Sequence, residues 1–493
     1  MTSDTTPGTA YDLAVVGAGP AGLAATAVAL LGGLTVALVD SGQELGGQYW
    51  RHPPRGSAVD RGEDLHHDLT TYERLTKTVQ DGVQQGRCRL LPLHQAWTVS
   101  RLGGPTAGPD VPEELSLHLV DRAAGPGRER TLRVTASRML LATGAYDRPL
   151  PFPGWDLPGV YTAGGIQALL KGSGVLAGNR VVVGGTGPFL LPVATGLAVR
   201  GASVVVCEAN DPRRWASGAA AALALPGKLA EGLGYAAALA RRRVPVYLRH
   251  AVTAAHGTDR VEAVTLSRLD ARGVVVPGTQ RLVEADAVGT GWGFVPQLDL
   301  AVTLGAELIR SWDGNQVVAV DAWQRTSVPG LSAAGEVCGI GGAELALREG
   351  QLAAEGVLRG LGRPAVTDGR ALDRMRRRIA RHRRFAAAMA HAHPVPEGWT
   401  SWLDDSVLVC RCEEVSAGQV RQAVRDGATG VRQVKQLTRA GMGWCQGRMC
   451  APAVGALAGG DDNEVPERLV VAPLPRGAHA APHAAGPSLA RHT

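Results

Sequence analysis

The stretch that decides the fold is YDLAVVGAGPAG, residues 11–22. An apolar run leads into a G-x-G-x-x-G turn, which predicts a strand, a tight turn and a helix that continues to about residue 31. The next apolar run, residues 34–39, predicts a second strand that ends at Asp40, whose carboxylate can accept hydrogen bonds from ribose hydroxyls. The turn glycines let the backbone approach a pyrophosphate, so the unit predicts a dinucleotide site. These glycines are Gly17, Gly19 and Gly22.

The same pattern returns farther along the chain, where Gly185 and Gly187 follow an apolar run and Glu208 ends the next one. Leu190 stands where the first unit has its third glycine, and a side chain there pushes the helix from the strand or narrows the phosphate turn. A second Rossmann fold is therefore predicted, with two interpretations. It binds NAD or another adenine nucleotide, with Glu208 repelling a 2′-phosphate, or it is a nucleotide fold kept as a scaffold.

Two tandem Rossmann units are typical of flavoproteins with two dinucleotide-binding domains, and other segments fit that architecture. Thr143-Gly144 resembles the turn that returns the chain to the first domain, and Gly335-Glu336 resembles the late flavin motif whose acid holds the ribityl chain. Gly47-Gln48 is expected to run along the flavin.

Thiol–disulfide chemistry is excluded, although disulfide reductases share this architecture. Those enzymes carry a cysteine pair after the second strand or in the second domain, and neither place has a pair here. Cys88, Cys207 and Cys338 are isolated, so each is expected to be a small buried apolar residue. Of these three, Cys338 is the one that could lie near the flavin.

Past residue 402 the chain changes character and carries four cysteines in the spacing C-x-C-x32-C-x4-C. A capping box of Ser416 and Gln419 predicts a helix between the two pairs. Four thiolates can hold [2Fe–2S] or zinc, and structural zinc sites usually have C-x2–4-C pairs, so an iron–sulfur cluster is favoured over zinc and over no metal. The glycine-rich loop before the third cysteine offers backbone N–H groups to cluster sulfurs. The four ligands are Cys410, Cys412, Cys445 and Cys450.

Composition and charge exclude several classes of protein. Of the 493 residues, 45% are hydrophobic and 19% charged, which rules out disorder for most of the chain. The net charge of +6 comes from residues 370–385, where eight arginines face one aspartate, so a nucleic-acid partner is not expected. This run predicts an amphipathic helix whose arginine face is solvated or docks a partner or anion. Residues 1–12 have neither the basic nor the apolar region of a signal peptide, so no signal peptide is expected, and no transmembrane segment is expected. Because seven cysteines are an odd number, a cytoplasmic chain without disulfides is expected.

The four-cysteine module resembles the bacterioferritin-associated-ferredoxin-like domain, and a flavin domain pair followed by it is similar to one group of flavoproteins. These are the α-type subunits of D-hydroxyproline dehydrogenase, opine oxidase, hydrogen cyanide synthase and dye-linked proline dehydrogenase. The similarity runs from residue 11 to about residue 470 and includes residues 164–167 (GGIQ) and 187–192 (GPFLLP), so Leu190 is typical of the group. The resemblance implies FAD and a [2Fe–2S] cluster in this chain. It also implies a partner flavoprotein subunit that oxidises an amino acid or amine and passes the electrons here.

The expected fold is therefore α/β, a tandem Rossmann flavoprotein with a small helical [2Fe–2S] domain at the C-terminus. No catalytic side chain is assigned, because flavin and cluster carry the chemistry and the protein supplies binding and electrostatics. Two rivals stay open: a self-sufficient NAD(P)H-dependent acceptor reductase fed through the second Rossmann domain, and a non-catalytic redox sensor or scaffold. The expected parts are a FAD-binding domain (1–155 and 285–365), an inserted second Rossmann domain (156–284), a basic helical linker (366–404), the cluster domain (405–460) and a mostly disordered tail (461–493).

Overall fold

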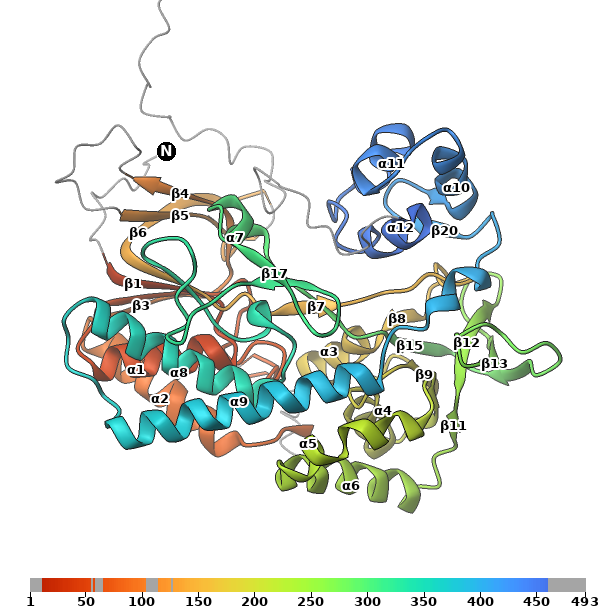
Figure 1. Cartoon of the computed structure of the whole chain (residues 1–493), viewed down its shortest axis with the longest axis horizontal. Helices are drawn as coiled ribbons and strands as arrows, with labels where there is room; N and C mark the ends of the chain where they lie inside the picture. The colour runs from red at the N-terminus through yellow and green to blue at the C-terminus, as the bar shows by residue number, and fades with distance from the viewer. Residues whose placement is uncertain (1–10, 55, 58–64, 103–113, 126, 460–493) are drawn as a thin grey trace, which may run out of the picture.

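The computed structural model describes residues 11–54, 56–57, 65–102, 114–125 and 127–459. Figure 1 shows two α/β units side by side, a long helix that runs along both of them, and a small helical unit beside the second one. No helix in these described ranges is both long and apolar enough to span a membrane. The predicted tail, residues 461–493, lies outside the described residues.

The first unit is built on a seven-stranded sheet in the order β3-β2-β1-β6-β5-β4, with β19 paired to β6. β1 pairs in parallel with β2 and β6, so the first glycine turn follows a central strand. α1 is buried from Ala21 to Leu30 because the sheet and α8 enclose an apolar helix. β1, α1 and β2 confirm the predicted strand–helix–strand unit. The elements are β1 (Tyr11–Val16), α1 (Pro20–Leu31), β2 (Val36–Val39), α2 (Leu69–Gln84), β3 (Cys88–Leu91), β4 (His94–Leu102), β5 (Glu114–Asp121), β6 (Arg130–Leu141), β19 (Leu331–Ala333) and α8 (Ala343–Gly360).

The second unit has a five-stranded sheet in the order β11-β10-β9-β15-β8, whose pairs are all parallel, and a three-stranded antiparallel sheet β12-β13-β14. Leu190 is accommodated opposite Gly291 on β15, since a Cβ on Gly291 would lie 3.2 Å from Leu190 Cδ2. The elements are β8 (Val160–Thr162), α3 (Ala163–Ser173), β9 (Arg180–Gly185), α4 (Leu190–Val199), β10 (Ser203–Glu208), η2 (Pro212–Gly218), α5 (Ala219–Leu223), α6 (Pro226–Arg241), β11 (Val246–Leu248), β12 (His250–His256), β13 (Ala263–Arg268), β14 (Arg281–Glu284) and β15 (Ala287–Gly291).

Two short antiparallel strands, β7 (Ala145–Asp147) and β16 (Phe294–Pro296), carry the chain between the two units. β15 still belongs to the second sheet, so the chain returns to the flavin unit between β15 and β16, later than the predicted boundary at residue 285. The return leads through α7 (Asp299–Thr303), β17 (Leu308–Arg310), β18 (Gln316–Val318) and η3 (Glu336–Cys338) to α8.

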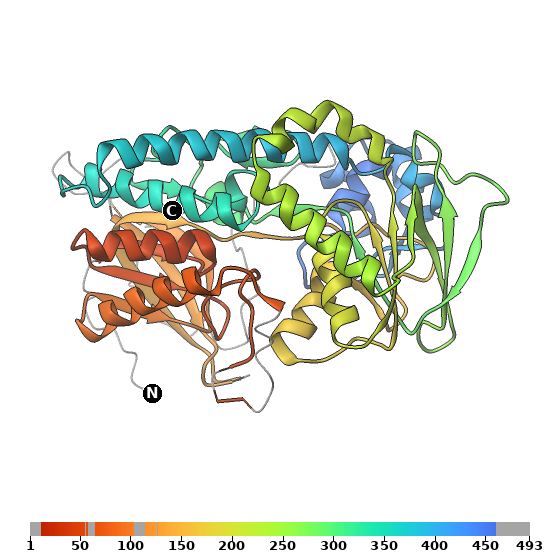
Figure 2. The same cartoon turned by 90° about the horizontal axis from the view of Figure 1, so that it is seen from below.

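The predicted basic helix is α9 (Gly369–Ala392), capped by Asp368, whose Oδ1 accepts from Ala371 N at 2.9 Å. It lies along α8 and then reaches α5 and η2 of the second unit (Figure 2). Its arginine face is divided, because Arg376 stacks on Trp323 at 4.2 Å and Arg383 pairs with a buried carboxylate of α8. The other arginines are exposed, which agrees with both interpretations of the arginine face. They are Arg370, Arg374, Arg377, Arg378, Arg381 and Arg384.

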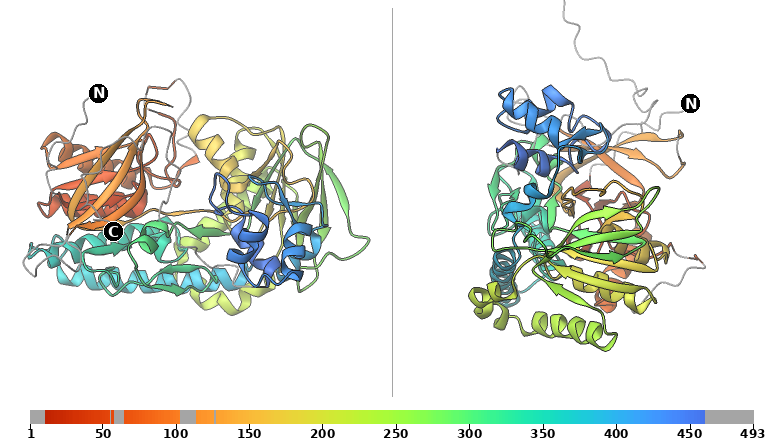
Figure 3. Two further views of the ribbon diagram at one scale, coloured as in Figure 1. Left: turned by 90° about the horizontal axis from the view of Figure 1, so that it is seen from above. Right: turned by 90° about the vertical axis from the view of Figure 1, so that its right-hand side faces the viewer.

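The C-terminal unit shares one hydrophobic core with the second unit. Trp292 and Trp402 pack with ring centroids 5.7 Å apart, and Trp402 Nε1 donates to Gly273 O at 3.0 Å. The unit is therefore fixed beside the three-stranded sheet (Figure 3). The capping box at Ser416 is confirmed. The elements are η4 (Glu397–Trp402), β20 (Leu408–Cys410), β21 (Val415–Ser416), α10 (Ala417–Arg425), α11 (Val431–Thr438) and α12 (Ala451–Ala458).

Candidate flavin and iron–sulfur sites

Each of the three glycines of the first turn is required for a different geometric reason. Gly17 has φ +104°, and a Cβ there would collide with the carbonyl oxygen of Ala142. A Cβ on Gly22 would collide with the carbonyl oxygen of Gly17, so these two glycines allow strand and helix to pack. Gly19 has the ordinary φ of −73°, and the atom nearest to a Cβ there is Gly47 Cα at 3.9 Å. Gly19 thus leaves open the space in front of the α1 N-terminus, where a pyrophosphate fits.

Asp40 lies at the end of β2, and its carboxylate holds the turn. Oδ2 accepts from Ala18 N at 2.5 Å and Oδ1 from Gly42 N at 2.6 Å. Burial raises the pKa of Asp40, and the two N–H groups oppose this shift because they stabilise the ionised form. Each carboxylate oxygen keeps a second lone pair, so Asp40 can still accept from a ribose hydroxyl as predicted.

The loop after β2 and the turn after β6 lie at the same edge of the sheet. Gly47 has φ +59°, and a Cβ there would lie 2.8 Å from Gly19 Cα, so the loop passes the turn at close range. Gln48 Oε1 accepts from Arg51 Nε at 3.0 Å. Thr143-Gly144 follows β6, which pairs with β1 and β19. Because the carboxyl ends of parallel strands meet at one edge, the fold brings the predicted flavin residues together.

Glu336 lies half-buried in η3, where its Oε1 accepts from Gly342 N at 2.9 Å. Burial raises the pKa of Glu336 to about 7, against the backbone N–H groups of Gly342 and Gly341. Gly335 N donates to Glu349 Oε2 at 3.0 Å, and the Glu349 carboxylate is buried. The predicted Gly335-Glu336 motif is thus hydrogen-bonded to another carboxylate, that of Glu349 on α8.

Sequence reasoning missed Glu349, which Arg383 of α9 neutralises. Arg383 Nε and Nη2 donate to Glu349 Oε1 at 3.0 and 2.9 Å. Burial raises the pKa of Glu349, and the Arg383 guanidinium opposes that shift. The available signal was a carboxylate on the otherwise apolar face of a helix, facing an arginine-rich segment.

The four predicted ligand cysteines gather between β20 and the start of α12. Cys410 and Cys450 are buried, Cys445 is half-buried and Cys412 is exposed. Cys410 neighbours Cys450, Cys450 neighbours Cys445, and Cys445 neighbours Cys412. The thiols form a chain of neighbours, and within the described ranges no three His, Cys, Asp or Glu side chains surround one point as a single metal ion requires. A Cβ on Gly443 would collide with Cys412 Cβ, so the loop needs a glycine there.

Hydrogen-bond donors point at these sulfur atoms. A hydrogen bond with Cys450 and then backbone N–H groups lower the pKa of Cys410 to about 6 and that of Cys445 to about 5. The same two bonds raise the pKa of Cys450. Since thiolates are the ligands of iron and N–H groups stabilise them, the donor set fits a cluster. The backbone donors are Cys412, Glu413 and Gly441 to Cys410, and Gly447 and Met449 to Cys445.

A short path of contacts joins the cysteine loop to the flavin edge. Arg448 lies between two of the cysteines, and its Nη2 donates to Asp299 Oδ2 at 2.9 Å; both side chains are mostly buried, at 19% and 11% exposure. Two residues before Asp299, Gln297 N donates to Gly144 O at 3.0 Å, and Gln297 O accepts from Thr143 Oγ1 at 2.8 Å. The Arg448–Asp299 ion pair and the hydrogen bonds of Gln297 therefore fix the position of the cysteine loop relative to the flavin edge.

Comparison with known proteins supports both sites. The chain matches the pyridine nucleotide-disulphide oxidoreductase family over residues 11–350 and the BFD-like [2Fe-2S] binding domain over residues 408–458. An opine oxidase subunit from Rhizobium meliloti (strain 1021) is 36% identical over 469 residues, 91% of this chain and 92% of the relative. Hydrogen cyanide synthase subunit HcnB from Pseudomonas aeruginosa is 31% identical over 442 residues, 88% of this chain and 90% of the relative. The chain belongs to the family of flavoprotein α-type subunits to which these opine oxidase and hydrogen cyanide synthase subunits belong.

A crystal structure of L-proline dehydrogenase from P. horikoshii shows the same fold, with a TM-score of 0.66 at 20% identity, over 96% of this chain and 80% of that one. The protein is a flavin-dependent oxidoreductase that carries FAD and a [2Fe–2S] cluster. The open space at Gly19 and the N–H groups around the cysteine sulfurs fit these two groups.

The second turn of this α-type subunit repeats the fold of the first. Gly185 has φ +139°, and a Cβ there would collide with the carbonyl oxygen of Gly291. Glu208 ends β10, and its carboxylate accepts from Gly187 N at 2.9 Å and from Thr186 Oγ1 at 3.0 Å. Gly187 faces the ring of His393, which sequence reasoning had not connected to this turn.

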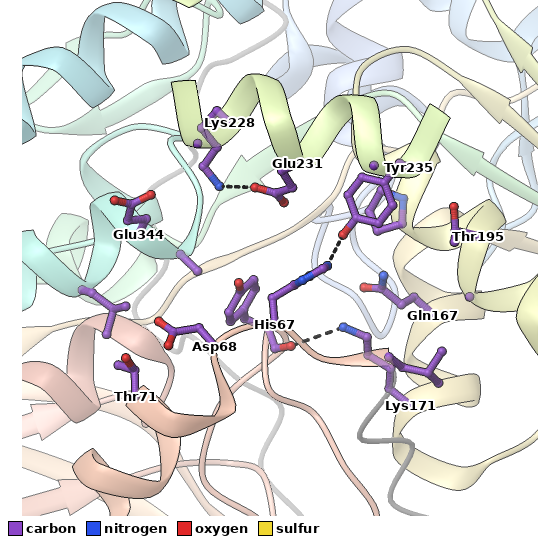
Figure 4. Close-up of a pocket in the computed structure, with 18 of the residues that line it drawn as sticks. His67, Asp68, Thr71, Gln167, Lys171, Thr195, Lys228, Glu231, Tyr235 and Glu344 are labelled. Atoms are coloured by element: carbon purple, nitrogen blue, oxygen red, sulfur yellow. Dashed lines mark hydrogen bonds and ion pairs between the residues drawn. The ribbon is translucent and has the colours of Figure 1, made fainter. Parts of the chain in front are cut away.

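A cleft of about 800 Å³ lies between the flavin unit and the second unit of the chain (Figure 4). A hydrogen bond between His67 Nε2 and the Tyr235 hydroxyl bridges it. Lys171 Nζ donates to Tyr49 O at 3.4 Å, and burial lowers the pKa of Lys171 to about 8. Tyr49 directly follows Gln48, so the cleft borders the predicted flavin loop. The cleft is lined by both polar and apolar side chains, and it can hold a small polar molecule.

Proposed function

We propose that this chain is the electron-transfer subunit of a heteromeric dehydrogenase that acts on amino acids or amines. A partner flavoprotein subunit oxidises the C–N bond of an opine, a hydroxyproline or a similar donor, and the electrons pass into this chain. FAD takes up and releases electrons in pairs or singly, and a [2Fe–2S] cluster carries them one at a time, which gives a reason to house both in one chain. The chain's own residues bind, orient and connect the two groups.

The cofactor ligands are part of the proposal. Gly17, Gly19, Gly22 and Asp40 hold the ADP half of FAD, while Gly47, Gln48, Thr143, Gly144, Gly335 and Glu336 line its flavin half. Cys410, Cys412, Cys445 and Cys450 hold the cluster.

The observation that carries the proposal is the contact between Arg448 and Asp299. It joins the loop of two cluster cysteines to the segment whose Gln297 is hydrogen-bonded to Thr143 and Gly144. A redox sensor or scaffold has no need for a mostly buried ion pair at this point. A chain that moves electrons needs its two centres held at one distance.

The partner is supported by the relatives, which are named as subunits of opine oxidase and of hydrogen cyanide synthase. Their high mutual coverage with this chain favours the same division of labour here. We expect the complex in the cytoplasm, because isolated reduced cysteines and a thiolate-bound cluster suit a reducing compartment.

Steady-state assays of the anaerobically purified full chain test the proposal. With a dye acceptor and D-hydroxyproline, proline, sarcosine, glycine or octopine, we expect the chain alone to turn over far below the ordinary ~1–10³ s⁻¹. Adding the co-purifying flavoprotein partner is expected to raise turnover into that range. Ordinary turnover by the chain alone would overturn the proposal. Bleaching of the flavin by NADH would favour the NAD(P)H reductase, and a flavin that no donor reduces would favour the sensor.

A further inference from the structure

The segment that follows α9 lies on the second dinucleotide turn. A Cβ built on Gly187 would touch His393 Cβ at 3.8 Å and His393 Cγ at 4.0 Å. Trp215 of η2 fixes the imidazole, because its Nε1 donates to His393 Nε2 at 2.9 Å. The next residue is held as well, since Asn210 Nδ2 donates to Pro394 O at 2.9 Å. The ring therefore lies where the second glycine of such a turn lets a pyrophosphate approach.

The acid of the second turn is occupied by the protein itself. Glu208 Oε2 accepts from Gly187 N, and its Oε1 accepts from Thr186 Oγ1 and from Asn210 N, each at 3.0 Å. His393 Nδ1 lies 3.5 Å from Glu208 Oε2, and both side chains are 15% exposed. Oε1 thus already accepts two hydrogen bonds and the His393 ring lies beside Oε2, whereas each oxygen of Asp40 accepts one.

The helix of the second turn is also set back. α1 begins at Pro20, directly after Gly19, whereas α4 begins at Leu190, and Phe189 is its N-cap. Pro188 occupies the position equivalent to Pro20, so the helix starts two residues later than its counterpart. The first N–H groups of this stretch are already used within the turn, because Leu190 N donates to Gly187 O at 3.2 Å and Leu191 N donates to Pro188 O at 3.1 Å.

From these contacts we infer that the second dinucleotide turn is filled by the chain's own His393–Pro394 segment and does not bind NAD or another adenine nucleotide. The residues present do not fit the ligand that the fold implies. The inference goes beyond the proposed function, because electron transfer to the cluster would work with or without a second nucleotide.

The other end of α9 explains why the segment stays in place. Arg383 binds the buried Glu349, and His382 Nε2 lies 3.2 Å from Glu344 Oε1 on α8. The segment that carries His393 therefore directly follows a helix that is anchored in the flavin unit. The end of α9 therefore packs on the second unit. The cluster unit also packs on the second unit, through the shared core that contains Trp292 and Trp402.

Two measurements on the full chain, loaded with FAD and cluster, test the inference. In the first, calorimetric titration of the unaltered chain with NAD⁺, NADH and ADP-ribose is expected to show no binding up to about 1 mM. FAD occupies the first turn in this experiment, so binding would report the second turn. Binding of one equivalent with a Kd below about 100 µM would overturn the inference.

The second measurement is a cross-link between the turn and the segment. In Gly187→Cys/His393→Cys the two Cβ atoms would lie 3.8 Å apart, which is a normal distance for a disulfide. We expect mild oxidation to link the two positions in most molecules, as identified by peptide mass mapping. Gly187→Cys/His391→Cys is the matched control, because His391 is an exposed histidine of the same helix end; its yield should be about tenfold lower. A folded, cofactor-loaded double variant that does not cross-link would contradict the inference, and if the variant fails to fold the titration decides.

Discussion

The two dinucleotide turns start from the same glycine pattern and end in different surroundings. At the first, the neighbour of Gly19 is another glycine, Gly47, and the helix N-terminus directly follows the turn. At the second, the neighbour of Gly187 is the ring of His393, and the helix begins two residues later. The first turn has free space for a ligand in front of it, whereas the second turn has the same fold without that space.

A chain can therefore have a nucleotide-binding fold without having a nucleotide-binding site. Both turns place an acid at the end of the next strand, and both acids accept hydrogen bonds from the turn. What distinguishes the turns is a segment that lies far away in the sequence and reaches one of them by way of a long helix. Variants at either turn test whether the two sites differ in this way.

The largest effect is expected from Gly19→Val. Gly19 has a φ that any residue adopts, so valine should not strain the backbone; it should fill the space where the pyrophosphate must approach. We expect flavin content after purification to fall by at least about tenfold, equivalent to ~1.4 kcal/mol of binding free energy. Gly187→Ala is the control at the second turn, and it should keep its FAD. A Gly19→Val protein with a full complement of flavin would mean that the first turn is not the FAD site.

Cys412→Ser should remove the cluster and leave the flavin. Cys412 is exposed at the edge of the thiol group, so the substitution takes away one iron ligand without opening the core. We expect the parent chain to hold two irons and two acid-labile sulfides, and the variant to lose most of both while its FAD absorbance stays. Cys207→Ser, at a buried cysteine of the second unit, should keep its iron. Stoichiometric zinc without labile sulfide in the anaerobically purified parent would refute the cluster.

Arg448→Ala should weaken the link between the cluster loop and the flavin unit. The substitution removes the guanidinium that pairs with the mostly buried Asp299 carboxylate, which costs about 1–3 kcal/mol. We expect slower passage of electrons from the reduced flavin to the cluster in stopped-flow experiments, with unchanged iron and FAD content. Arg439→Ala breaks a pair within the cluster unit in which the arginine side chain is 70% exposed, and it should cost about 0–1 kcal/mol and leave the rate alone. Equal rates in both variants would show that the Arg448 contact does not serve electron transfer.

The sequence predicted the features that depend on neighbours along the chain. The first turn, the capping box at Ser416 and the cysteine pairs follow from spacing, backbone freedom and periodicity, and each is found where it was expected. The contacts that give these features their roles join distant segments. Neither the His393 ring on Gly187 nor the Arg448–Asp299 pair has a local signal, because each depends on how the three units pack. The same holds for Leu190, which is tolerated because a glycine stands opposite it on β15.

The last prediction concerns the pH dependence of stability that Glu336 gives to the flavin edge. Burial raises the pKa of Glu336 to about 7, so between about pH 4.5 and 7 the folded chain holds a proton that the unfolded chain releases. The folded state binds more protons in this window, and its stability should therefore fall as the pH rises through it and level off above pH 7. Glu336→Gln cannot ionise, so in FAD-free protein it should flatten this part of the pH dependence, measured by the thermal unfolding midpoint. If the Glu336→Gln variant loses as much stability as the parent between pH 5 and pH 7, the half-buried acid at the flavin edge is ionised throughout this range and does not carry the pH dependence.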